Sequence, residues 1–417
     1  MTYVTAIGGL LLLVLVHELG HFVAAKATGM RALKFYVGFP PAIIRKKIGE
    51  TEYGLGAIPL GGFVKIPGML RPEAPDLWAV AELLEKNEKL PNELATAIGI
   101  KHDEISRLLG QGRSDDANAE LQELRRLLDE ADPYMSDVER KRARKCLERL
   151  EESLDPRAYW RSSRRSRLIV IAAGPLTNIV ATYLILTGLA VTGLPQPVRA
   201  IPQVAGLEQN MPAAKAGLKV GDRIVSINGK PIRTFDDARA AISQSNGQPL
   251  QIVVRRDGRT VELPPIRPVE RGGRYIIGFI PDGEVHTKSF PVWEAPVEGA
   301  AQMWNMLSGT VTGLKQQGTS SLSGPVGIVR VSADVADTGA PYYLWLLAYI
   351  SLSLGILNLF PFLPLDGGHI LMLALERIRG RAVSRATFER VSAFGIALVL
   401  LLFLFGLHND LLNPQPR

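Results

Sequence analysis

A His-Glu-x-x-His motif lies inside an apolar stretch near the amino terminus. Between Val4 and Ala25, the only ionisable residues are His17, Glu18 and His21. Residues four apart share one face of a helix, so both imidazoles can reach one metal ion with Glu18 beside them. Ionisable groups inside a membrane-length apolar segment are costly and usually functional. The motif predicts two zinc ligands and a carboxylate that takes a proton from water. The alternative is a chance match on a buried helix.

Four apolar segments are long enough to cross a bilayer, which needs about 20 residues. They are residues 5–27, 168–194, 343–363 and 391–407. The chain is 47% hydrophobic and only 21% charged, and its net charge is +7. Arginines cluster before the second and fourth segments. Because cytoplasmic loops carry excess Lys and Arg, we expect a polytopic α-helical membrane protein with four transmembrane helices and both termini outside. The single cysteine, Cys146, excludes an intrachain disulfide framework and a Cys-built zinc site.

Glycines alternate with apolar residues between residues 35 and 66. This pattern is typical of short strands with glycine-marked bends. Such irregular backbone can enter a membrane only where protein or a water-filled cavity covers it. We expect a re-entrant β-hairpin here, and the alternative is an ordinary surface hairpin.

Residues 73–160 form a charged insert whose leucines recur at helix spacing. Within it, residues 94–100 and 103–109 resemble a helix-turn-helix with Gly99 at the turn. DNA binding is disfavoured because Asp103 and Glu104 begin the second of these helices, where a recognition helix would be basic. We expect a helical cytoplasmic hairpin that docks on the protein or on a cytosolic partner.

Residues 196–285 read as a small β-rich domain with an Asn228-Gly229 hairpin turn. The run from Pro212 to Ile232 closely resembles the bacterial type of PDZ domain, which takes an extended peptide as an added edge strand. An envelope protein or peptide is therefore a candidate ligand.

After this domain, apolar residues between 300 and 314 form a helical stripe. It predicts an amphipathic helix, either at the membrane surface or packed on the PDZ-like domain.

A zinc site needs a third protein ligand, and Asp366 is the candidate. It is the only acidic residue between Asp337 and Glu376, at a helix end broken by Pro and Gly. The first and third spans run in the same direction, so Asp366 can lie at the depth of the two histidines. The alternatives are a helix cap for Asp366 and a solvated side chain for His369.

The His17–His21 motif together with Pro364-Leu365-Asp366-Gly367-Gly368 resembles the site-2 protease family of intramembrane metalloproteases, closest to the bacterial regulator of sigma-E protease type with a single PDZ domain. Residues 174–178 in the second span, 54–56 in the β region and 323–328 before the third span match the family in order. The 73–160 insert departs from the family, and its role is not implied by the resemblance.

The resemblance implies that Zn²⁺ is held by His17, His21 and Asp366, with Glu18 as the catalytic base. It implies a bacterial inner-membrane protease that cuts single-span proteins, such as anti-sigma factors or remnant signal peptides, with the PDZ domain as a size filter. Residues near the substrate would be Asn178, Asn358, Leu55, Gly56, Gly61 and Gly62. The two asparagines could equally join helices, and the glycine-rich strand could pair with an unwound substrate.

These signals divide the chain into nine parts. They are 1–30 with the zinc motif, 31–72 with the hairpin, 73–160 as the insert, 161–195 as the second span, 196–285 as the PDZ domain, 286–341 as a linker with the amphipathic helix, 342–376 as the third span with Asp366, 377–390 as a cytoplasmic loop, and 391–417 as the fourth span with the tail. Three other functions stay open: a non-catalytic scaffold that binds envelope proteins through the PDZ domain, an ion-handling membrane protein, and DNA-linked regulation through the insert.

Overall fold

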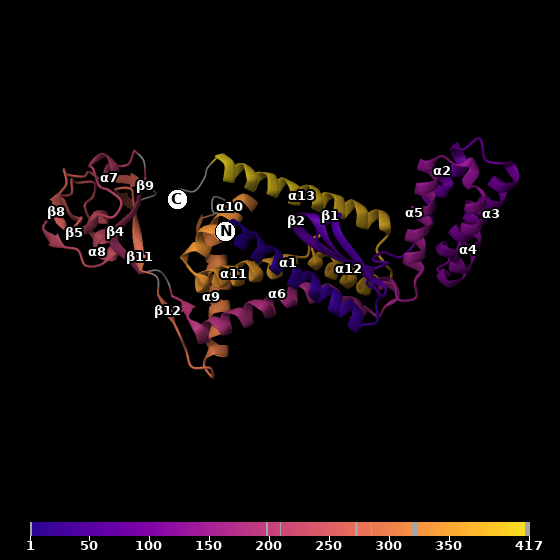
Figure 1. Cartoon of the computed structure of the whole chain (residues 1–417), viewed down its shortest axis with the longest axis horizontal. Coiled ribbons are helices and arrows are strands. Elements are labelled where there is room, and N and C mark those ends of the chain that lie inside the picture. The colour runs from indigo at the N-terminus through magenta and orange to yellow at the C-terminus, as the bar shows by residue number, and fades with distance from the viewer. Residues whose placement is uncertain are drawn as a thin grey trace. The chain divides into compact units, whose positions relative to one another are not determined.

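Four long apolar helices dominate the chain (Figure 1). They are α1 (Thr2–Ala27), α6 (Arg164–Thr192), α11 (Ala340–Asn358) and α13 (Arg385–Leu412). Each is long and apolar enough to cross a membrane, which confirms that four such helices are present. The predicted end of the third segment at residue 363 is wrong, because α11 stops at Asn358. The computed structural model describes residues 2–196, 199–208, 210–271, 274–284, 286–317 and 324–412.

The chain divides into two compact units. The first comprises Met1–Leu184, Val329–Asp337 and Leu346–Phe405, and the second comprises Ile185–Ile328, Thr338–Trp345 and Gly406–Arg417. In the first unit, small residues bring the helices close together. A Cβ added at Gly20 of α1 would overlap Thr177 and Ala173 of α6, and one at Gly355 of α11 would lie 2.9 Å from the carbonyl oxygen of Pro175. α6 is therefore in close contact with both α1 and α11.

Two strands follow α1: β1 (Lys34–Ile48) and β2 (Thr51–Lys65). The first part of β1, residues 34–37, pairs with residues 52–55 on one side and with 62–65 on the other, because β2 bends back past Gly61. Residues 42–48 pair with the start of β2 and form one edge of this small antiparallel sheet. Residues 62–65 form the other edge, which among the described residues is paired on one side only. The predicted strands are present, and they contact α1.

The insert is a bundle of α2 (Trp78–Lys86), α3 (Asn92–Gly110), α4 (Ser114–Glu130) and α5 (Asp137–Leu154), with short 3₁₀ turns at Ala74–Leu77, Asp132–Tyr134 and Tyr159–Arg161. The leucines that recur at helix spacing on α4 and α5 are buried in one core. The predicted turn at Gly99 is wrong, because α3 runs through that residue without a break. A glycine costs a helix about 1 kcal/mol, and burial of Ile98 and Ile105 offsets that cost.

The apolar α11 ends at Asn358, and α12 (Asp366–Arg379) begins after seven intervening residues with Asp366. Cβ atoms at Gly367 and Gly368 would overlap the backbone of the preceding loop, so only glycine fits this tight turn. The turn fixes Asp366 as the first residue of α12. α13 follows after a short loop.

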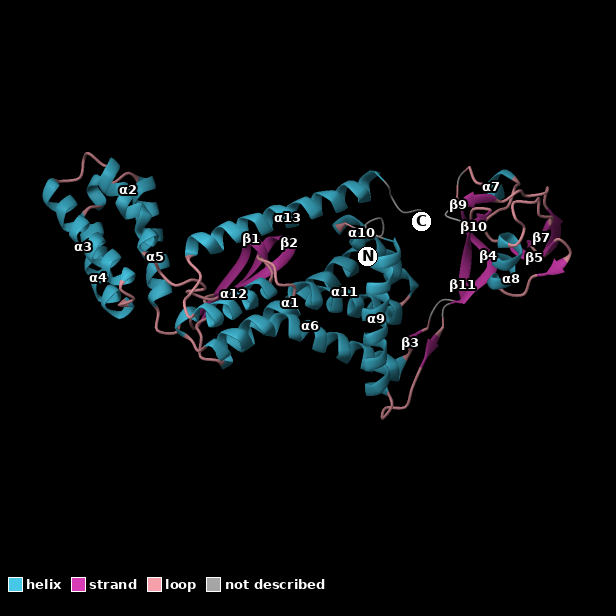
Figure 2. Cartoon of the chain, turned by 180° about the vertical axis from the view of Figure 1, so that it is seen from behind, coloured by secondary structure: helices cyan, strands magenta, loops and turns pink. Residues whose placement is uncertain are grey.

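The second unit contains a six-stranded sheet with the order β11-β4-β5-β7-β8 and with β6 paired to β5 (Figure 2). Its strands are β4 (Arg199–Leu207), β5 (Arg223–Ile227), β6 (Lys230–Pro231), β7 (Ile252–Arg256), β8 (Arg259–Glu262) and β11 (Phe279–Glu284). The short strands β3 (Leu194–Pro195), β9 (Val269–Arg271), β10 (Arg274–Ile276) and β12 (Thr287–Lys288) form two further pairs, β9 with β10 and β3 with β12. The predicted turn at Asn228-Gly229 joins β5 and β6, and both residues have positive φ.

Helices α7 (Pro212–Lys215), α8 (Phe235–Ser243), α9 (Ala295–Gln317) and α10 (Pro325–Thr338) complete the chain. On α9, Ala295 and Met306 are buried, whereas Trp304 of the predicted stripe is 67% exposed. Gly299 of α9 packs against Thr187 of α6. Residues 318–323 lie outside the described part of the chain. They include Ser323, the first residue of the 323–328 segment that resembles the family.

Candidate metal centre

Two histidines and one aspartate meet at a single point in the first unit. α1 places His17 and His21 one turn apart, with their Nε2 atoms 3.3 Å from each other. The start of α12 places Oδ2 of Asp366 3.2 Å from Nε2 of His17 and 3.3 Å from Nε2 of His21. Among the described residues, this is the only group of three His, Cys, Asp or Glu side chains arranged to hold a metal.

The spacing of these three atoms fits zinc. Ligands about 2.0–2.1 Å from a tetrahedral Zn²⁺ lie roughly 3.3 Å from one another, and the three separations are 3.2–3.3 Å. Lone pairs on two neutral imidazoles and a carboxylate would repel at this distance unless a cation or a proton lay between them. The donor set of two nitrogens and one carboxylate oxygen is also one that zinc accepts.

A hydrogen bond on the side of the ring opposite to Asp366 fixes the orientation of His21. Its Nδ1–H donates a hydrogen bond of 2.8 Å to the carbonyl oxygen of Val170 on α6. That bond selects the tautomer whose lone pair is on Nε2, the atom that faces Asp366. One turn further along α6, Gly174 leaves room for the ring, because a Cβ there would overlap Nε2 and lie 2.6 Å from Cε1.

The His17 ring has a different neighbour. The side-chain amide nitrogen of Asn178 lies 3.4 Å from Nδ1 of His17, and Asn178 is fully buried. Oδ1 of Asn178 has no hydrogen-bond partner among the described atoms. If Nε2 of His17 faces a metal, Nδ1 carries a proton and needs an acceptor. Turning the amide over would supply Oδ1 as that acceptor.

Glu18 lies where α1 meets the edge of the small β sheet. A Cβ added at Gly62 would lie 3.0 Å from Cγ of Glu18 and 2.7 Å from the carbonyl oxygen of Tyr36. Glycine at position 62 therefore allows the edge segment 62–65 to approach the carboxylate. This contact brings the β2 edge next to the predicted base.

The remaining predicted substrate residues lie in different settings. The Asn358 amide donates 3.1 Å to the carbonyl oxygen of Leu354 on its own helix. Leu55 is paired on both sides, with Val37 and with Ile44, and Gly56 pairs with Ala42. Gly61 lies at the bend that leads into the 62–65 edge.

Two further residues support the centre but carry no chemistry that a sequence pattern reveals. Val170 contributes only its backbone oxygen, and Gly174 contributes only the absence of a side chain. The Gly-Pro pair at 174–175 was a visible signal, but nothing in the sequence connects it to His21. His369 lies outside the group of three, with its ring 5.4 Å from that of Phe388.

Comparison with known proteins identifies relatives over almost the whole chain. The sequence profile described as Peptidase family M50 matches residues 5–402. The chain is 30% identical to the regulator of sigma-W protease RasP of Bacillus subtilis, covering 96% of this chain and 95% of the relative. It is 31% identical to the zinc metalloprotease RasP of Geobacillus kaustophilus (96% and 95%) and 30% identical to the putative zinc metalloprotease Atu1380 of Agrobacterium fabrum (96% and 93%).

Proposed function

Since this chain belongs to Peptidase family M50, the site-2 proteases, we propose that His17, His21 and Asp366 hold its zinc and that Glu18 is its catalytic base. The protein is a zinc metalloendopeptidase of a bacterial membrane, and it acts in regulated intramembrane proteolysis. The observation that carries the assignment of residues is the triangle of Nε2, Nε2 and Oδ2 atoms, whose edges of 3.2–3.3 Å match a tetrahedral zinc site.

Bound zinc would act as a Lewis acid that activates water and polarises the scissile carbonyl. Glu18 takes the proton from the attacking water and then passes it to the leaving amine. Val170 and Asn178 hold the two imidazoles in orientation, so the metal ligands need not reorganise during the reaction. We assign Asn178 to this positioning role in preference to substrate contact, because it lies behind His17. Asn358 remains a candidate for contact with the substrate backbone.

A transmembrane substrate hides its carbonyls in helical hydrogen bonds, so it must unwind before cleavage. We assign β1 and β2 as the re-entrant hairpin and the edge at residues 62–65 as the segment that pairs with the unwound substrate. This edge is paired on one side and contacts Glu18 through Gly62. Leu55 and Gly56 lie in the interior of the sheet, so we assign them a structural role and no contact with the substrate. Gly61 forms the bend that leads into this edge.

The membrane topology follows from charge. Arginines cluster at the start of α6 and at the start of α13, so both starts lie in the cytoplasm and both chain termini lie outside. The segments 73–160 and 377–390 are then cytoplasmic, whereas 196–285 and 286–341 are extracytoplasmic. The remaining segments, 1–30, 31–72, 161–195, 342–376 and 391–417, belong to the membrane part.

The substrates are single-span membrane proteins whose extracytoplasmic part has already been cut away, such as anti-sigma factors or remnant signal peptides.

We assign the β-rich region at 196–285 as a PDZ domain, supported by its six-stranded sheet and the helix α8. It would exclude untrimmed substrates or bind an envelope protein. The bundle at 73–160 would bind a cytosolic protein. DNA is disfavoured as its ligand, because Gly99 forms no turn in α3 and because Asp103 and Glu104 are acidic.

The test combines metal content with cleavage. Wild type, Glu18→Gln and Asp366→Ala are purified in detergent and assayed for zinc and for cutting of a single-span substrate. We expect about one zinc per chain in wild type and in Glu18→Gln, no cutting by Glu18→Gln, and loss of both zinc and cutting in Asp366→Ala. Chelator-insensitive cutting by a metal-free wild type would remove the assignment. A metal-free protein that never cuts would favour a scaffold.

A further inference from the structure

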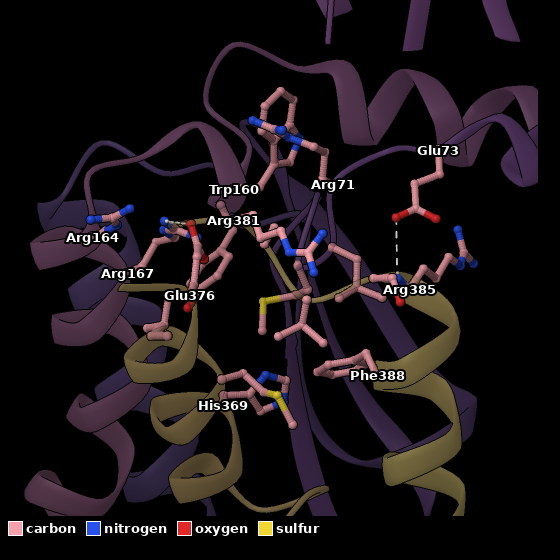
Figure 3. A pocket seen from close by; sticks show the side chains of 18 of the residues that line it. Arg71, Glu73, Trp160, Arg164, Arg167, His369, Glu376, Arg381, Arg385 and Phe388 are labelled. Carbon is pink, nitrogen blue, oxygen red and sulfur yellow. Dashed lines mark hydrogen bonds and ion pairs between the residues drawn. The ribbon is translucent and has the colours of Figure 1, made fainter. Parts of the chain in front are cut away.

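A cavity of about 590 Å³ in the first unit is surrounded by arginines (Figure 3). Its walls come from four segments that are far apart in the sequence, at 69–73, 159–167, 369–376 and 380–388. Trp160 and Arg71 lie on one side of it, and His369 and Phe388 lie on the other. The cavity is distinct from the candidate metal centre, since none of His17, His21 and Asp366 lines it.

The cavity is strongly cationic. Five arginines and two glutamates line it, without a single lysine. The arginines are Arg71, Arg164, Arg167, Arg381 and Arg385. Arg167 forms a two-pronged ion pair with Glu376, at 3.0 Å for each bond, and Arg385 pairs with Asp76 and Glu389. The other three arginines have no carboxylate partner among the described residues, so their charge is available to a ligand.

The geometry suits a phosphate group. Guanidinium groups bind phosphate oxygens in a planar, two-pronged manner, whereas the ammonium group of Lys acts as a point charge. This difference explains why the cavity contains Arg and no Lys. The Arg71 guanidinium is held 5.1 Å from the centre of the Trp160 ring, which pre-orders it. The amino-terminal ends of α6 and α13 also lie at the cavity, at Arg164 and Arg385, and helix amino termini attract anions.

Part of the cavity wall is apolar. Met372 and Leu373 of α12 and Phe388 of α13 are among the residues that line the cavity. Beyond the cavity, the same two helices expose apolar side chains, including Ile378 at 80% and Phe394 at 68%. A ligand with an anionic head and an apolar tail would therefore be matched at both ends. α6 and α13 are candidate membrane spans, so the ends that meet here lie at the depth of lipid head groups.

We propose that this cavity binds the phosphate of an anionic phospholipid head group, with the acyl chains running along α12 and α13. The three unpaired guanidinium groups of Arg71, Arg164 and Arg381 hold the phosphate. The lipid bridges α12, which carries Asp366, to the loop before the helical insert. This site goes beyond the protease activity and does not depend on it.

The test separates the cavity from the general positive charge at this end of the spans. One variant carries Arg71→Gln, Arg164→Gln and Arg381→Gln. The matched control carries Arg165→Gln, Arg377→Gln and Arg379→Gln, which are exposed residues on the same segments or helices that do not line the cavity. Both triples remove three positive charges. Binding of phosphatidylglycerol is measured by native mass spectrometry in neutral maltoside micelles, with phosphatidylcholine and inorganic phosphate as separate arms.

We expect wild type and the control triple to bind phosphatidylglycerol equally, and the cavity triple to bind it at least roughly tenfold more weakly. Phosphatidylcholine should bind poorly to all three, and inorganic phosphate should not displace the lipid. Unchanged zinc content and melting temperature show that each variant is folded. Equal loss in both triples, or no binding by wild type, overturns the proposal. Efficient displacement by inorganic phosphate overturns it in favour of a soluble phosphate ligand.

Discussion

Nδ1 of His21 donates a 2.8 Å hydrogen bond to the carbonyl oxygen of Val170, so the opposite ring nitrogen faces Asp366. A residue 149 positions away along the chain thus decides which nitrogen of His21 can bind a metal. The bond requires the His21 ring to occupy the space left by Gly174 on α6. The proposed metal centre therefore depends on the packing of α1 against α6 as well as on its three proposed ligands.

Gly174→Ala should displace the His21 ring, because the added Cβ would overlap Nε2. Loss of an orienting partner typically lowers metal affinity about 10–100-fold. We expect zinc affinity and cleavage to fall together by that factor, measured by competition with a chelator and by cutting of a model substrate. Gly188→Ala is the control on the same helix, since a Cβ there meets nothing within 4 Å. Equal effects of the two changes would contradict the packing argument.

Asn178→Leu should weaken zinc binding by about tenfold, because His17 loses the acceptor for its Nδ1 proton. Asn178→Asp keeps an acceptor and should retain zinc. Asn358→Leu should leave zinc affinity unchanged, since the Asn358 amide bonds only to Leu354 of its own helix among the described contacts. Isothermal titration of the metal-free protein gives these affinities. If Asn178→Leu raises KM and leaves zinc affinity intact, Asn178 is a substrate contact.

The edge of β2 should contact the substrate directly. In a background where the only cysteine is removed by Cys146→Ser, Phe63→Cys places a thiol on the 62–65 edge, and Lys46→Cys places one on the opposite edge of the same sheet. A substrate with one cysteine near its cleavage position should form a disulfide with the first variant and not with the second. Equal crosslinking at both edges would rule out strand addition at residues 62–65.

The β-rich region should lose stability in acid through Asp222. Burial alone would raise the pKa of this carboxyl, but two 2.7 Å bonds from Arg256 and one of 2.8 Å from the Lys219 N–H outweigh burial and hold the pKa below its ordinary value. A carboxyl with a lowered folded-state pKa stabilises the fold above about pH 4, and this stability is lost as the pH falls through the lowered pKa.

Calorimetry of wild type and Asp222→Asn at several pH values isolates this group. The variant should melt at a lower temperature than wild type at pH 7, and the gap should narrow as the pH falls through the lowered pKa of Asp222. Asp237→Asn is a comparison at an exposed helix cap of the same region, where a smaller gap is expected. A gap that stays constant with pH would mean that titration of Asp222 does not stabilise the region.

The insert should unfold without loss of the metal centre. Leu124 of α4 is fully buried in the core of the bundle, so Leu124→Ala should destabilise it by about 3 kcal/mol. Val138→Ala changes a residue that is 60% exposed and should have little effect. Hydrogen exchange of residues 78–154 should rise only in the first variant, while zinc content stays the same. Loss of zinc in Leu124→Ala would show that the insert supports the catalytic part.

The sequence by itself determined the helices, because their signals are local. The apolar length of residues 5–27 and 391–407 requires spanning helices in lipid, and the leucine spacing in the insert places one face of each helix in a core. The pair His17 and His21 follows from helical periodicity. Asp366 could be inferred from topology, because the chain offers no other acid between Asp337 and Glu376. The local reading failed at Gly99, where tertiary burial of Ile98 and Ile105 keeps α3 continuous.

Only the tertiary structure decided the surroundings of the metal ligands. Val170 acts through a backbone oxygen, Gly174 through a missing side chain, and Gly62 by letting a strand edge approach Glu18. None of these roles has a residue pattern, because each depends on the distance between segments that are far apart in the chain. The arginine-lined cavity has the same origin, since the sequence shows basic clusters but not that five arginines from three segments face one space. Close packing of helices in three dimensions sets these distances, and the order of residues does not.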